Sequence, residues 1–305
     1  VHIGNYLGAM QGHVNLQDDR ENYIFIADLH SLTTVKNRAE LQELILDLAM
    51  DYLALGLDPN KAVFFRQSDV PEHAELTWVL SCLTPMPMLE LAHAYKDAVA
   101  KGIKEINAGL FTYPVLMAVD ILIYKPDIVP VGKDQKQHVE IARDLAGKFN
   151  RTFGEVFKLP TPYIPEEVAV VIGTDGQKMS KSYGNTIEIF ASDKTLKKQI
   201  MGIVTDSTPV ESPKEPDTIY MLYSYFANED EKAKLLERYR AGGMGYGDAK
   251  KMLLEKVIET FKPYRERLKN DIAYVKDILK KGAEKARIVA SETKKEVWDK
   301  TGLSI

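Results

Sequence analysis

Short apolar runs alternate with amphipathic segments through the first half of the chain, and this alternation constrains the possible folds more than any other feature. Three runs have the length and residue types of buried parallel strands: Asn22–His30 (NYIFIADLH), Ala62–Val70 (AVFFRQSDV) and Asp127–Gly132 (DIVPVG). A segment with helical spacing of its apolar residues follows each run. Strand–helix–strand order of this kind predicts a parallel sheet with helices on both faces.

The helices that follow these runs have recognisable start signals. Asn37 and Glu40 form a capping box at the start of a helix over residues 39–58. Pro71 occupies a position typical of a helix start and precedes the segment EHAELTWVLSCL. A third helix is expected over residues 133–150, directly after the third strand.

The second half of the chain follows a different pattern. From about Ser192 onward the apolar spacing is helical nearly throughout, with interruptions at TDSTPVESPKEPD and AGGMGYG. We therefore predict an α/β fold, with a doubly wound parallel Rossmann-like sheet in a catalytic domain of residues 1–187. An all-helical domain of residues 188–305 is expected to follow it.

Charge is unevenly distributed along the chain. Residues 246–305 hold 15 Lys and Arg against 10 Asp and Glu, a net charge of +5, although the net charge of the whole chain is −4. A basic segment on an acidic body favours a polyanionic partner for that segment. The alternative is a solvated helix surface of mixed charge.

Composition narrows the class of protein. The 305 residues are 45% hydrophobic, enough for a sizeable core and two domains. No apolar run approaches the roughly 20 residues of a membrane span, and no signal-peptide pattern is visible. The single cysteine, Cys82, excludes an internal disulfide, fits a reducing cytosol, and is expected to be a small buried hydrophobe rather than a nucleophile. The sequence opens with Val1, so we expect a short leading segment to be missing from it.

The common signatures of nucleotide and metal sites are absent from the sequence. There is no P-loop, and GGMGYG lies between two helical segments rather than after a strand. HExxH and CxxC are also absent, so a metal held by the protein itself is not expected. A phosphate site in this chain must therefore be of another kind.

Two segments are candidates for that site. In HIGN, Gly4 would allow a nucleotide to approach closely, while His2 and Asn5 offer hydrogen bonds to phosphate oxygens. The alternative is that this common tetrapeptide has no such role. The second segment is the glycine-flanked KMSKS, Lys178–Ser182.

The KMSKS segment combines two cations and two hydroxyls on one loop. Lys178 and Lys181 lie three residues apart, and Ser180 and Ser182 add hydroxyl and backbone donors. This arrangement suits a triphosphate whose charge grows as pyrophosphate leaves. The alternative is an ordinary solvated basic loop.

HIGN near the start and KMSKS after the sheet resemble the two signatures of the class I aminoacyl-tRNA synthetases. Thr112–Tyr124 (TYPVLMAVDILIY) and Asp127–Leu145 (DIVPVGKDQKQHVEIARDL) closely resemble the bacterial type of tryptophanyl-tRNA synthetase within this class. The resemblance extends over essentially all 305 residues.

The residues of this block fit an indole ring, which has one N–H donor and a wide apolar face. Asp120 is an acceptor when ionised, and Met117 lies one helical turn before it on the same face. Val129 and Val131 alternate along a strand and point the same way. Alternatively, Asp120 caps or pairs within a helix, and the three apolar residues belong to an ordinary core.

The resemblance implies specific roles in tryptophan binding. The counterpart of Asp120 accepts the indole N–H, and that of Met117 packs on the ring. Tyr113, His30 and Gln135 match positions that bind the substrate's ammonium or carboxylate, or line the pocket. His30 alternatively serves as a structural hydrogen-bonding residue at the end of a strand.

For ATP, the resemblance points to the two signatures and to two further places. It implies contacts from the following residues: Gly4, Asn5, Gly132, Lys133, Asp134, Val171 through its backbone, Lys178, Met179, Ser180, Lys181 and Ser182. Gly132 and Asp134 would meet the ribose at a helix start, where exposed N–H groups favour oxygen ligands.

The reaction implied by the resemblance has two steps. Tryptophan attacks the α-phosphate of Mg·ATP to give tryptophanyl-adenylate and pyrophosphate, and the terminal adenosine of tRNA(Trp) then takes the tryptophanyl group. His2, Asn5, Lys178, Ser180, Lys181 and Ser182 are the expected catalytic residues. A homodimer in the cytoplasm, with no membrane partner, is also implied.

The helical domain would then bind the anticodon. The expected contacts come from one cluster: Tyr264, Arg265, Arg267 and Lys269. Three alternatives remain at this point: a tyrosyl-tRNA synthetase, an RNA-binding or regulatory protein that has lost activation, and an adenylate-forming ligase for a small molecule.

Two departures from the family pattern affect these expectations. The leading strand with the family's Q-P-S-G approach to the first signature is absent from the sequence. The segment from Leu91 also lacks the usual MTQFKDKS. Lys96 keeps one lysine, but Ala98 stands where the next basic residue is expected, so Lys101 or Lys104 would have to substitute.

Overall fold

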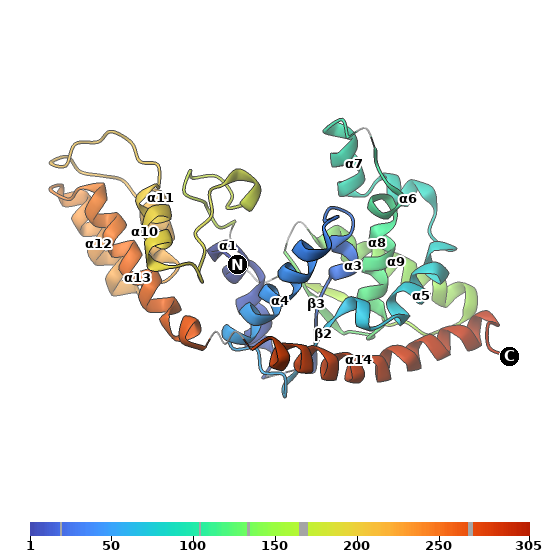
Figure 1. Ribbon diagram of the computed structural model, residues 1–305. Coiled ribbons are helices and arrows are strands. Elements are labelled where there is room, and N and C mark those ends of the chain that lie inside the picture. The colour runs from blue at the N-terminus through green and yellow to red at the C-terminus, as the bar shows by residue number, and fades with distance from the viewer. Residues whose placement is uncertain (19, 104, 133–134, 165–169, 268–270) are drawn as a thin grey trace. The chain divides into compact units, whose positions relative to one another are not determined.

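The computed structural model describes residues 1–18, 20–103, 105–132, 135–164, 170–267 and 271–305 (Figure 1). The chain forms two compact units. The first unit comprises Val1–Gly12, Asp51–Gly56 and Glu166–Lys269. The second unit comprises His13–Met50, Leu57–Pro165 and Asn270–Ile305.

The second unit contains the parallel strands that the apolar runs predict. β1 (Asn22–Ile26) pairs in parallel with β2 (Ala62–Arg66), with Tyr23 opposite Val63. β3 (Ile128–Pro130) pairs in parallel with β4 (Thr161–Tyr163). The α/β class with parallel strands is thus confirmed, and the described residues arrange these strands as two two-stranded sheets.

Helices make up most of the second unit, and several begin where the sequence predicts. Asn37 Oδ1 accepts from the backbone of Ala39 and Glu40, at the start of α4. The elements wholly inside this unit are α3 (Asp28–Ser31), the 3₁₀ turn η2 (Gln67–Asp69), α5 (Glu72–Ser81), α6 (Met86–Glu90), α7 (His93–Ala100), α8 (Ala108–Leu122), α9 (Lys136–Phe153) and α14 (Ile272–Thr301). α2 (Gln11–Leu16) and α4 (Arg38–Ala54) contribute residues to both units.

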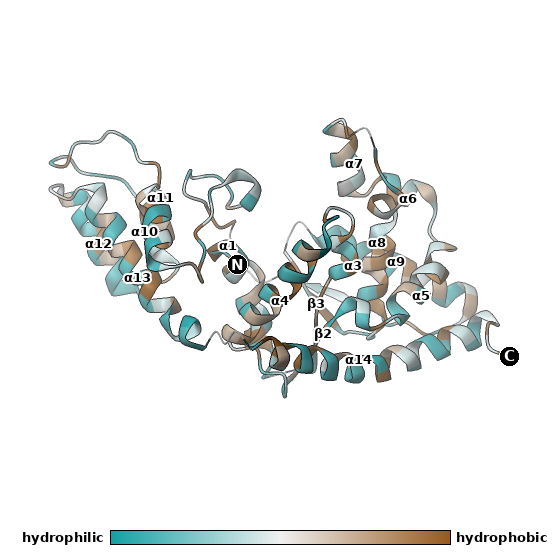
Figure 2. Cartoon of the chain, viewed as in Figure 1, coloured by the Kyte–Doolittle hydropathy of each residue, from teal (hydrophilic) through white to brown (hydrophobic). Residues whose placement is uncertain are grey.

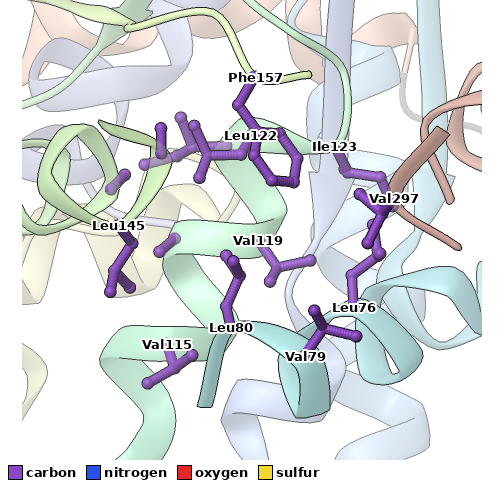
Figure 3. Close-up of a cluster of buried hydrophobic side chains, with 14 of the residues drawn as sticks. Leu76, Val79, Leu80, Val115, Val119, Leu122, Ile123, Leu145, Phe157 and Val297 are labelled. Carbon is purple, nitrogen blue, oxygen red and sulfur yellow. The ribbon is translucent and has the colours of Figure 1, made fainter. Parts of the chain in front are cut away.

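One hydrophobic core joins these helices. Val115, Val119 and Leu122 of α8 pack with residues of α5, α9 and α14 (Figure 3). In Figure 2, α8 is largely hydrophobic, whereas α14 alternates hydrophobic and hydrophilic segments, as a helix with one buried face should. This core holds α8, the helix that contains Asp120, rigidly in place.

α14 lies against β2 at a point where only glycine fits. A Cβ atom on Gly282 would lie 1.8 Å from the carbonyl oxygen of Phe64, far inside van der Waals contact. The missing side chain lets the helix backbone approach the strand directly. The last helix of the chain therefore belongs to the unit that contains the strands.

The first unit is helical around its own core. Its elements are α1 (Ile3–Asn5), the π-helical turn η1 (Tyr6–Met10), η4 (Lys181–Tyr183), α10 (Asp193–Met201), α11 (Thr218–Ser224), α12 (Glu229–Ala241) and α13 (Tyr246–Arg267). Leu253, Val257 and Phe261 form the buried stripe of α13. The ring of Tyr6 meets that of Phe261 edge-on at 5.0 Å, so the start of the chain is packed into this core.

The compact units consist of interleaved segments, so they do not correspond one to one to residues 1–187 and 188–305. The functional division between those two ranges stays a prediction. The first two predicted strands end earlier than expected, at Ile26 and Arg66, because the polar residues that follow form α3 and η2. The buried position expected for Cys82 is also wrong: this residue is exposed, because it caps the C-terminal end of α5 rather than facing the core. Within the described ranges, no helix is both long and apolar enough to cross a membrane.

Candidate active site

The KMSKS loop presents its two lysines outward from a buried methionine. Met179 is 4% exposed, and its backbone N–H donates to Val171 O at 2.8 Å. The side chains of Lys178 and Lys181 are exposed. The loop is therefore anchored at its centre, while its cations remain available to a ligand.

A buried asparagine fixes the path of this loop. Asn185 is 2% exposed, and its Oδ1 accepts from the backbone N–H of Ser180 at 2.8 Å. Its Nδ2 donates to Lys178 O at 3.0 Å and to Asp175 Oδ1 at 2.7 Å. Sequence reasoning did not assign this role, although Asn185 closes the conspicuous stretch GQKMSKSYGN.

The hydroxyls of the loop lie side by side. Ser180 Oγ and Ser182 Oγ are 2.7 Å apart, within hydrogen-bond distance. Ser182 lies in the 3₁₀ turn η4, which also contains Lys181. One short turn thus holds a cation and a hydroxyl next to a second hydroxyl.

The HIGN segment forms a closed capping box. Asn5 N–H donates to His2 Nδ1 at 3.3 Å, and His2 N–H donates to Asn5 Oδ1 at 3.2 Å. A Cβ on Gly4 would lie 3.0 Å from the His2 ring, so glycine leaves room for this arrangement. Part of the hydrogen-bonding capacity of His2 and Asn5 is thus used locally, whereas His2 Nε2 and Asn5 Nδ2 have no hydrogen-bond partner in the part of the chain that the structure describes.

The two signatures lie together in the first unit. Gly4 N–H donates to Met179 Sδ at 3.4 Å. Burial lowers the pKa of His2 to about 4, with a smaller contribution from the positive charge of Lys181. His2 is therefore neutral at pH 7, and because its Nδ1 accepts a hydrogen bond, its proton is on Nε2.

Asp120 is a buried carboxylate of the second unit. It is 6% exposed and accepts from three donors among the described residues. His30 Nε2 lies 2.7 Å from Oδ2, whereas Gln67 Nε2 at 2.7 Å and His73 Nδ1 at 2.6 Å both lie next to Oδ1. Burial alone would raise the pKa of Asp120, but hydrogen bonds from His30 and His73 outweigh it and hold that pKa below its usual value. The carboxylate is therefore ionised at neutral pH.

The residues predicted around Asp120 are found in the same unit. Met117 lies one turn earlier on α8 and is half-buried. Tyr113, one further turn away, meets the His30 ring edge-on at 5.9 Å, and its hydroxyl lies 3.2 Å from His138 Nε2. Burial and the charge of Asp97 raise the pKa of Tyr113, so its hydroxyl stays protonated.

The structure gives His30 a partner that the sequence did not suggest. His30 was expected to bind the substrate's polar groups or line its pocket, or else to be structural. Its Nε2 bonds to Asp120, and its side chain is 19% exposed. One ring edge therefore supports the carboxylate while part of the ring remains open to a ligand.

The two valines predicted to face the indole lie in and directly after β3, and the burial of this strand does not alternate. Val129 lies in β3, and Val131 follows it, with its N–H donating to Tyr163 O at 3.0 Å. Both are half-buried and pack against the core. Gln135 N–H donates to Gly132 O at 3.0 Å, which shapes the turn before α9. The predicted ATP contacts Lys133 and Asp134 lie outside the described residues.

Three residues that support Asp120 were missed by sequence reasoning. They are Gln67 of η2, His73 of α5 and Tyr124, whose hydroxyl lies 2.8 Å from His73 Nε2. Nothing in their local sequence marks them, because their role depends on folding that brings η2 and α5 against α8. All three are buried or half-buried within the second unit.

The predicted anticodon cluster has partners inside the first unit. Arg265 donates to Asp193 Oδ1 at 2.7 Å and to Ala191 O at 2.6 Å, so it links α13 to the start of α10. The guanidinium of Arg267 lies 5.9 Å from the centre of the Tyr264 ring. Lys269 lies outside the described residues. A role for this cluster in RNA binding stays a prediction.

The departure near Lys96 has a structural reason. Lys96 lies on α7, and Ala98 is 4% exposed, so a long basic side chain at position 98 would have to displace its neighbours. Lys101 follows α7 and is exposed, and its role in place of residue 98 stays a prediction. Lys104, the other substitute, lies outside the described residues.

Comparison with known proteins places this arrangement in a family. Residues 1–262 match the family model of the tRNA synthetases class I (W and Y). The chain is similar to the tryptophan–tRNA ligase of Fusobacterium nucleatum, with 54% identity over 99% of the chain and 94% of the relative. It is also similar to the tryptophan–tRNA ligase of Rhodopirellula baltica, with 53% identity over 95% of the chain and 92% of the relative.

The solved structures that resemble this chain point to the same family as the relatives in sequence. The crystal structure of tryptophanyl-tRNA synthetase from Campylobacter jejuni complexed with ADP and tryptophan has a TM-score of 0.93 and 50% identity, covering 99% of this chain and 96% of that one. A tyrosyl-tRNA synthetase from Archaeoglobus fulgidus, with 20% identity and a TM-score of 0.66, shares the fold alone. The chain belongs to the class I tRNA synthetases for tryptophan and tyrosine and, within them, to the bacterial type of tryptophan–tRNA ligase.

Proposed function

We propose that this ligase selects tryptophan through Asp120 and activates it with ATP through the HIGN and KMSKS segments. The observation that carries the proposal is the buried, ionised carboxylate of Asp120, which three donors hold in place. The binding of ADP and tryptophan by the Campylobacter jejuni relative supports both halves of the assignment.

Asp120 has one acceptor position left for a substrate. A carboxylate has about four acceptor positions, two on each oxygen. Within the described residues, Gln67 and His73 fill those of Oδ1, and His30 fills one of Oδ2. The indole N–H takes the remaining position on Oδ2, and Met117 with the two valines of the strand contacts the ring. A side chain without an N–H would leave a buried charge only partly paired, so the pocket rejects it strongly.

Tyr113, His30 and Gln135 surround the polar end of the amino acid in this proposal. The Tyr113 hydroxyl stays protonated and can donate to the substrate carboxylate or accept from its ammonium. The partly exposed edge of His30 offers a further contact. These roles orient the carboxylate for attack, which is the main requirement of a reaction that needs no covalent nucleophile.

Activation is an in-line displacement at the α-phosphate of Mg·ATP. A carboxylate oxygen of tryptophan forms a bond to the α-phosphorus, and the bond from that phosphorus to the bridging oxygen breaks, which releases pyrophosphate. Lys178 and Lys181, with the hydroxyls of Ser180 and Ser182, neutralise the charge that grows on the leaving group. Backbone groups of Met179 and Val171 hold the loop in position.

His2 and Asn5 act on phosphate oxygens as neutral donors. His2 donates through Nε2, because its Nδ1 is engaged by Asn5 N–H and its pKa is lowered to about 4. Gly4 allows the nucleotide to approach the backbone, and Gly132 is assigned to the ribose. The ATP contacts of Lys133 and Asp134 rest on the sequence alone.

The second step transfers tryptophan from the adenylate to the terminal adenosine of tRNA(Trp), and residues 188–305 bind the anticodon in this proposal. The net charge of +5 over residues 246–305 favours an RNA partner. We also infer a homodimer that acts in the cytoplasm, where ATP, tryptophan and tRNA are available and where a single cysteine such as Cys82 stays reduced.

Aminoacylation of purified tRNA(Trp) tests the proposed function. We expect labelled tryptophan to become bound to tRNA in an ATP-dependent reaction, and labelled tyrosine not to. RNA binding without any tryptophan-dependent use of ATP would instead indicate a regulatory protein. Adenylate formation without charging of any tRNA would indicate a small-molecule ligase.

A further inference from the structure

The most buried histidine among the described residues of the second unit is not one of the expected substrate contacts, yet it contacts Asp120, the residue proposed to select tryptophan. His73 is 0% exposed and lies in the first turn of α5. Its Nδ1 is 2.6 Å from Asp120 Oδ1, and its Nε2 is 2.8 Å from the Tyr124 hydroxyl. Both ring nitrogens are therefore used inside the protein.

The two contacts determine which ring nitrogen carries the proton. An ionised carboxylate only accepts, so His73 Nδ1 must donate to Asp120. Burial raises the pKa of Tyr124, with smaller contributions from Asp120, Tyr23 and Glu72, so its hydroxyl stays protonated. That hydroxyl donates to His73 Nε2 and fixes the tautomer in which Nδ1 holds the hydrogen.

The first turn of α5 is itself fixed from another helix. Glu72 is 1% exposed, and its Oε1 accepts from Arg287 Nη2 at 3.1 Å and from Ser291 Oγ at 2.9 Å, both on α14. His73 is the next residue along the chain, so the contacts of Glu72 with α14 help to hold the imidazole next to the Asp120 carboxylate. This chain of contacts lies entirely within the second unit.

We propose that His73, oriented by Tyr124, is a positioning residue that sets the selectivity of the enzyme for tryptophan. By donating to Oδ1 it keeps Asp120 ionised and leaves the open acceptor position on Oδ2, toward the indole N–H. The inference rests on the proposed role of Asp120 and assigns a second residue to the same selection. Loss of the His73 donor leaves Asp120 with less compensation for its burial, so the carboxyl group takes up a proton at higher pH.

Several other titratable and charged groups belong to the same network. His30 of α3 contacts Asp120 directly, and Tyr124 contacts His73. Tyr23 of β1 stacks on Tyr124, and Glu72 of α5 pairs with Arg287 of α14. A substitution at position 73 replaces none of these side chains, although it removes the hydrogen-bond partner of the Tyr124 hydroxyl. A shift in the pH dependence of His73→Leu that His73→Asn reverses therefore reports the loss of the imidazole donor.

The test uses two substitutions of His73 in the full chain. His73→Leu removes the donor, and His73→Asn restores one, because the Asn Nδ2 occupies nearly the place of the imidazole Nδ1. The Michaelis constants for tryptophan and for ATP are measured by ATP–pyrophosphate exchange between pH 5.5 and 8.5. The same assay uses 3-(3-benzothienyl)-L-alanine, an analogue in which sulfur replaces the indole N–H.

We expect the KM for tryptophan of the unchanged enzyme to stay nearly constant over this range, because Asp120 remains ionised. In His73→Leu it should rise about tenfold for each pH unit below the new pKa of Asp120, while the KM for ATP stays within about twofold. Discrimination against the benzothienyl analogue should fall at least about tenfold, and His73→Asn should restore most of both properties.

Two further variants keep the test decisive. Tyr124→Phe removes only a hydroxyl, so it can replace His73→Leu if that variant does not fold. It should raise the KM for tryptophan as His73→Leu does, but by a smaller factor. Tyr239→Phe is the matched control, because Tyr239 is 1% exposed and its hydroxyl donates to Asp217 in the first unit. It should change neither the KM for tryptophan nor its pH dependence.

A pH-independent KM for tryptophan in His73→Leu, with unchanged discrimination, would overturn the inference. So would equal losses for tryptophan and ATP that His73→Asn does not restore, since they indicate a purely structural histidine. The proposed function fails separately, in the unchanged enzyme, if tryptophan does not drive exchange at all.

Discussion

Asp120→Asn is the substitution that isolates the charge of the tryptophan-selecting residue. It replaces one carboxylate oxygen by an NH₂ group and leaves the size and shape of the side chain unchanged. Gln67 and His73 both donate to Oδ1, so the amide oxygen must stay at that position. The NH₂ group then takes the place of Oδ2, where His30 and the indole N–H require an acceptor.

The expected loss of affinity for tryptophan can be estimated from the hydrogen bond that is lost. A hydrogen bond to a charged acceptor contributes about 1.5–3 kcal/mol, and the indole N–H would face another donor instead. Because each factor of ten in affinity corresponds to about 1.4 kcal/mol, the Kd for tryptophan should rise about 10- to 150-fold. His30 can change its tautomer to accept from the amide, so the cost to folding stays smaller than the cost to binding.

Titration calorimetry with tryptophan and, separately, with ATP measures both effects on the same protein. We expect the Kd for ATP to change by less than about twofold, since no described ATP-directed residue contacts Asp120. Equal losses for the two ligands would mean that Asp120 supports the fold rather than the indole. A change of less than about threefold for tryptophan would refute the assignment of Asp120 as the indole acceptor.

Three further predictions concern other parts of the molecule. Lys181→Ala should lower the rate of ATP–pyrophosphate exchange about 10²–10³-fold, because it removes a cation from the leaving pyrophosphate. Rapid-quench kinetics should show this loss together with an unchanged Kd for tryptophan. Gly282→Ala should destabilise the protein by about 1–3 kcal/mol in urea unfolding, because its Cβ would overlap Phe64 O. Gly247→Ala, which has open space around it, should be neutral or stabilising. The pKa of His2 is lowered to about 4 in the folded protein, so the unfolded state takes up this proton first as the pH falls. The free energy of unfolding should therefore decrease as the pH drops from about 6.5 toward 4. A His2→Asn variant that loses stability equally over that range would contradict this.

The sequence predicted those elements of the fold whose signals are local. β1 (NYIFI) and β2 (AVFFR) are short runs rich in aromatic and β-branched residues, so both were found without knowledge of their partners. The three-residue strand β4 was missed, because it includes Pro162 and has no apolar run. The packing of α14 on β2 was also missed, because it depends on Gly282 meeting a strand far away in the sequence.

In the candidate site, too, the sequence identified residues with a local signal but not those whose role depends on contacts between distant segments. Asp120, Met117 and the KMSKS lysines stand out through their residue types and spacing, so a resemblance could assign them. The donors His73 and Gln67 could not be identified, because they act on Asp120 only once α5 and η2 pack against α8. Conversely, Arg265 fits a basic RNA-binding face by sequence, but its guanidinium binds Asp193 and a backbone carbonyl.

The assignment of Asp120 as the indole acceptor can be tested by ATP–pyrophosphate exchange with each of the twenty amino acids. We expect tryptophan alone to drive rapid exchange, because only its side chain brings an indole N–H to the open acceptor position of Asp120. Exchange driven by tyrosine, or by no amino acid, would contradict it.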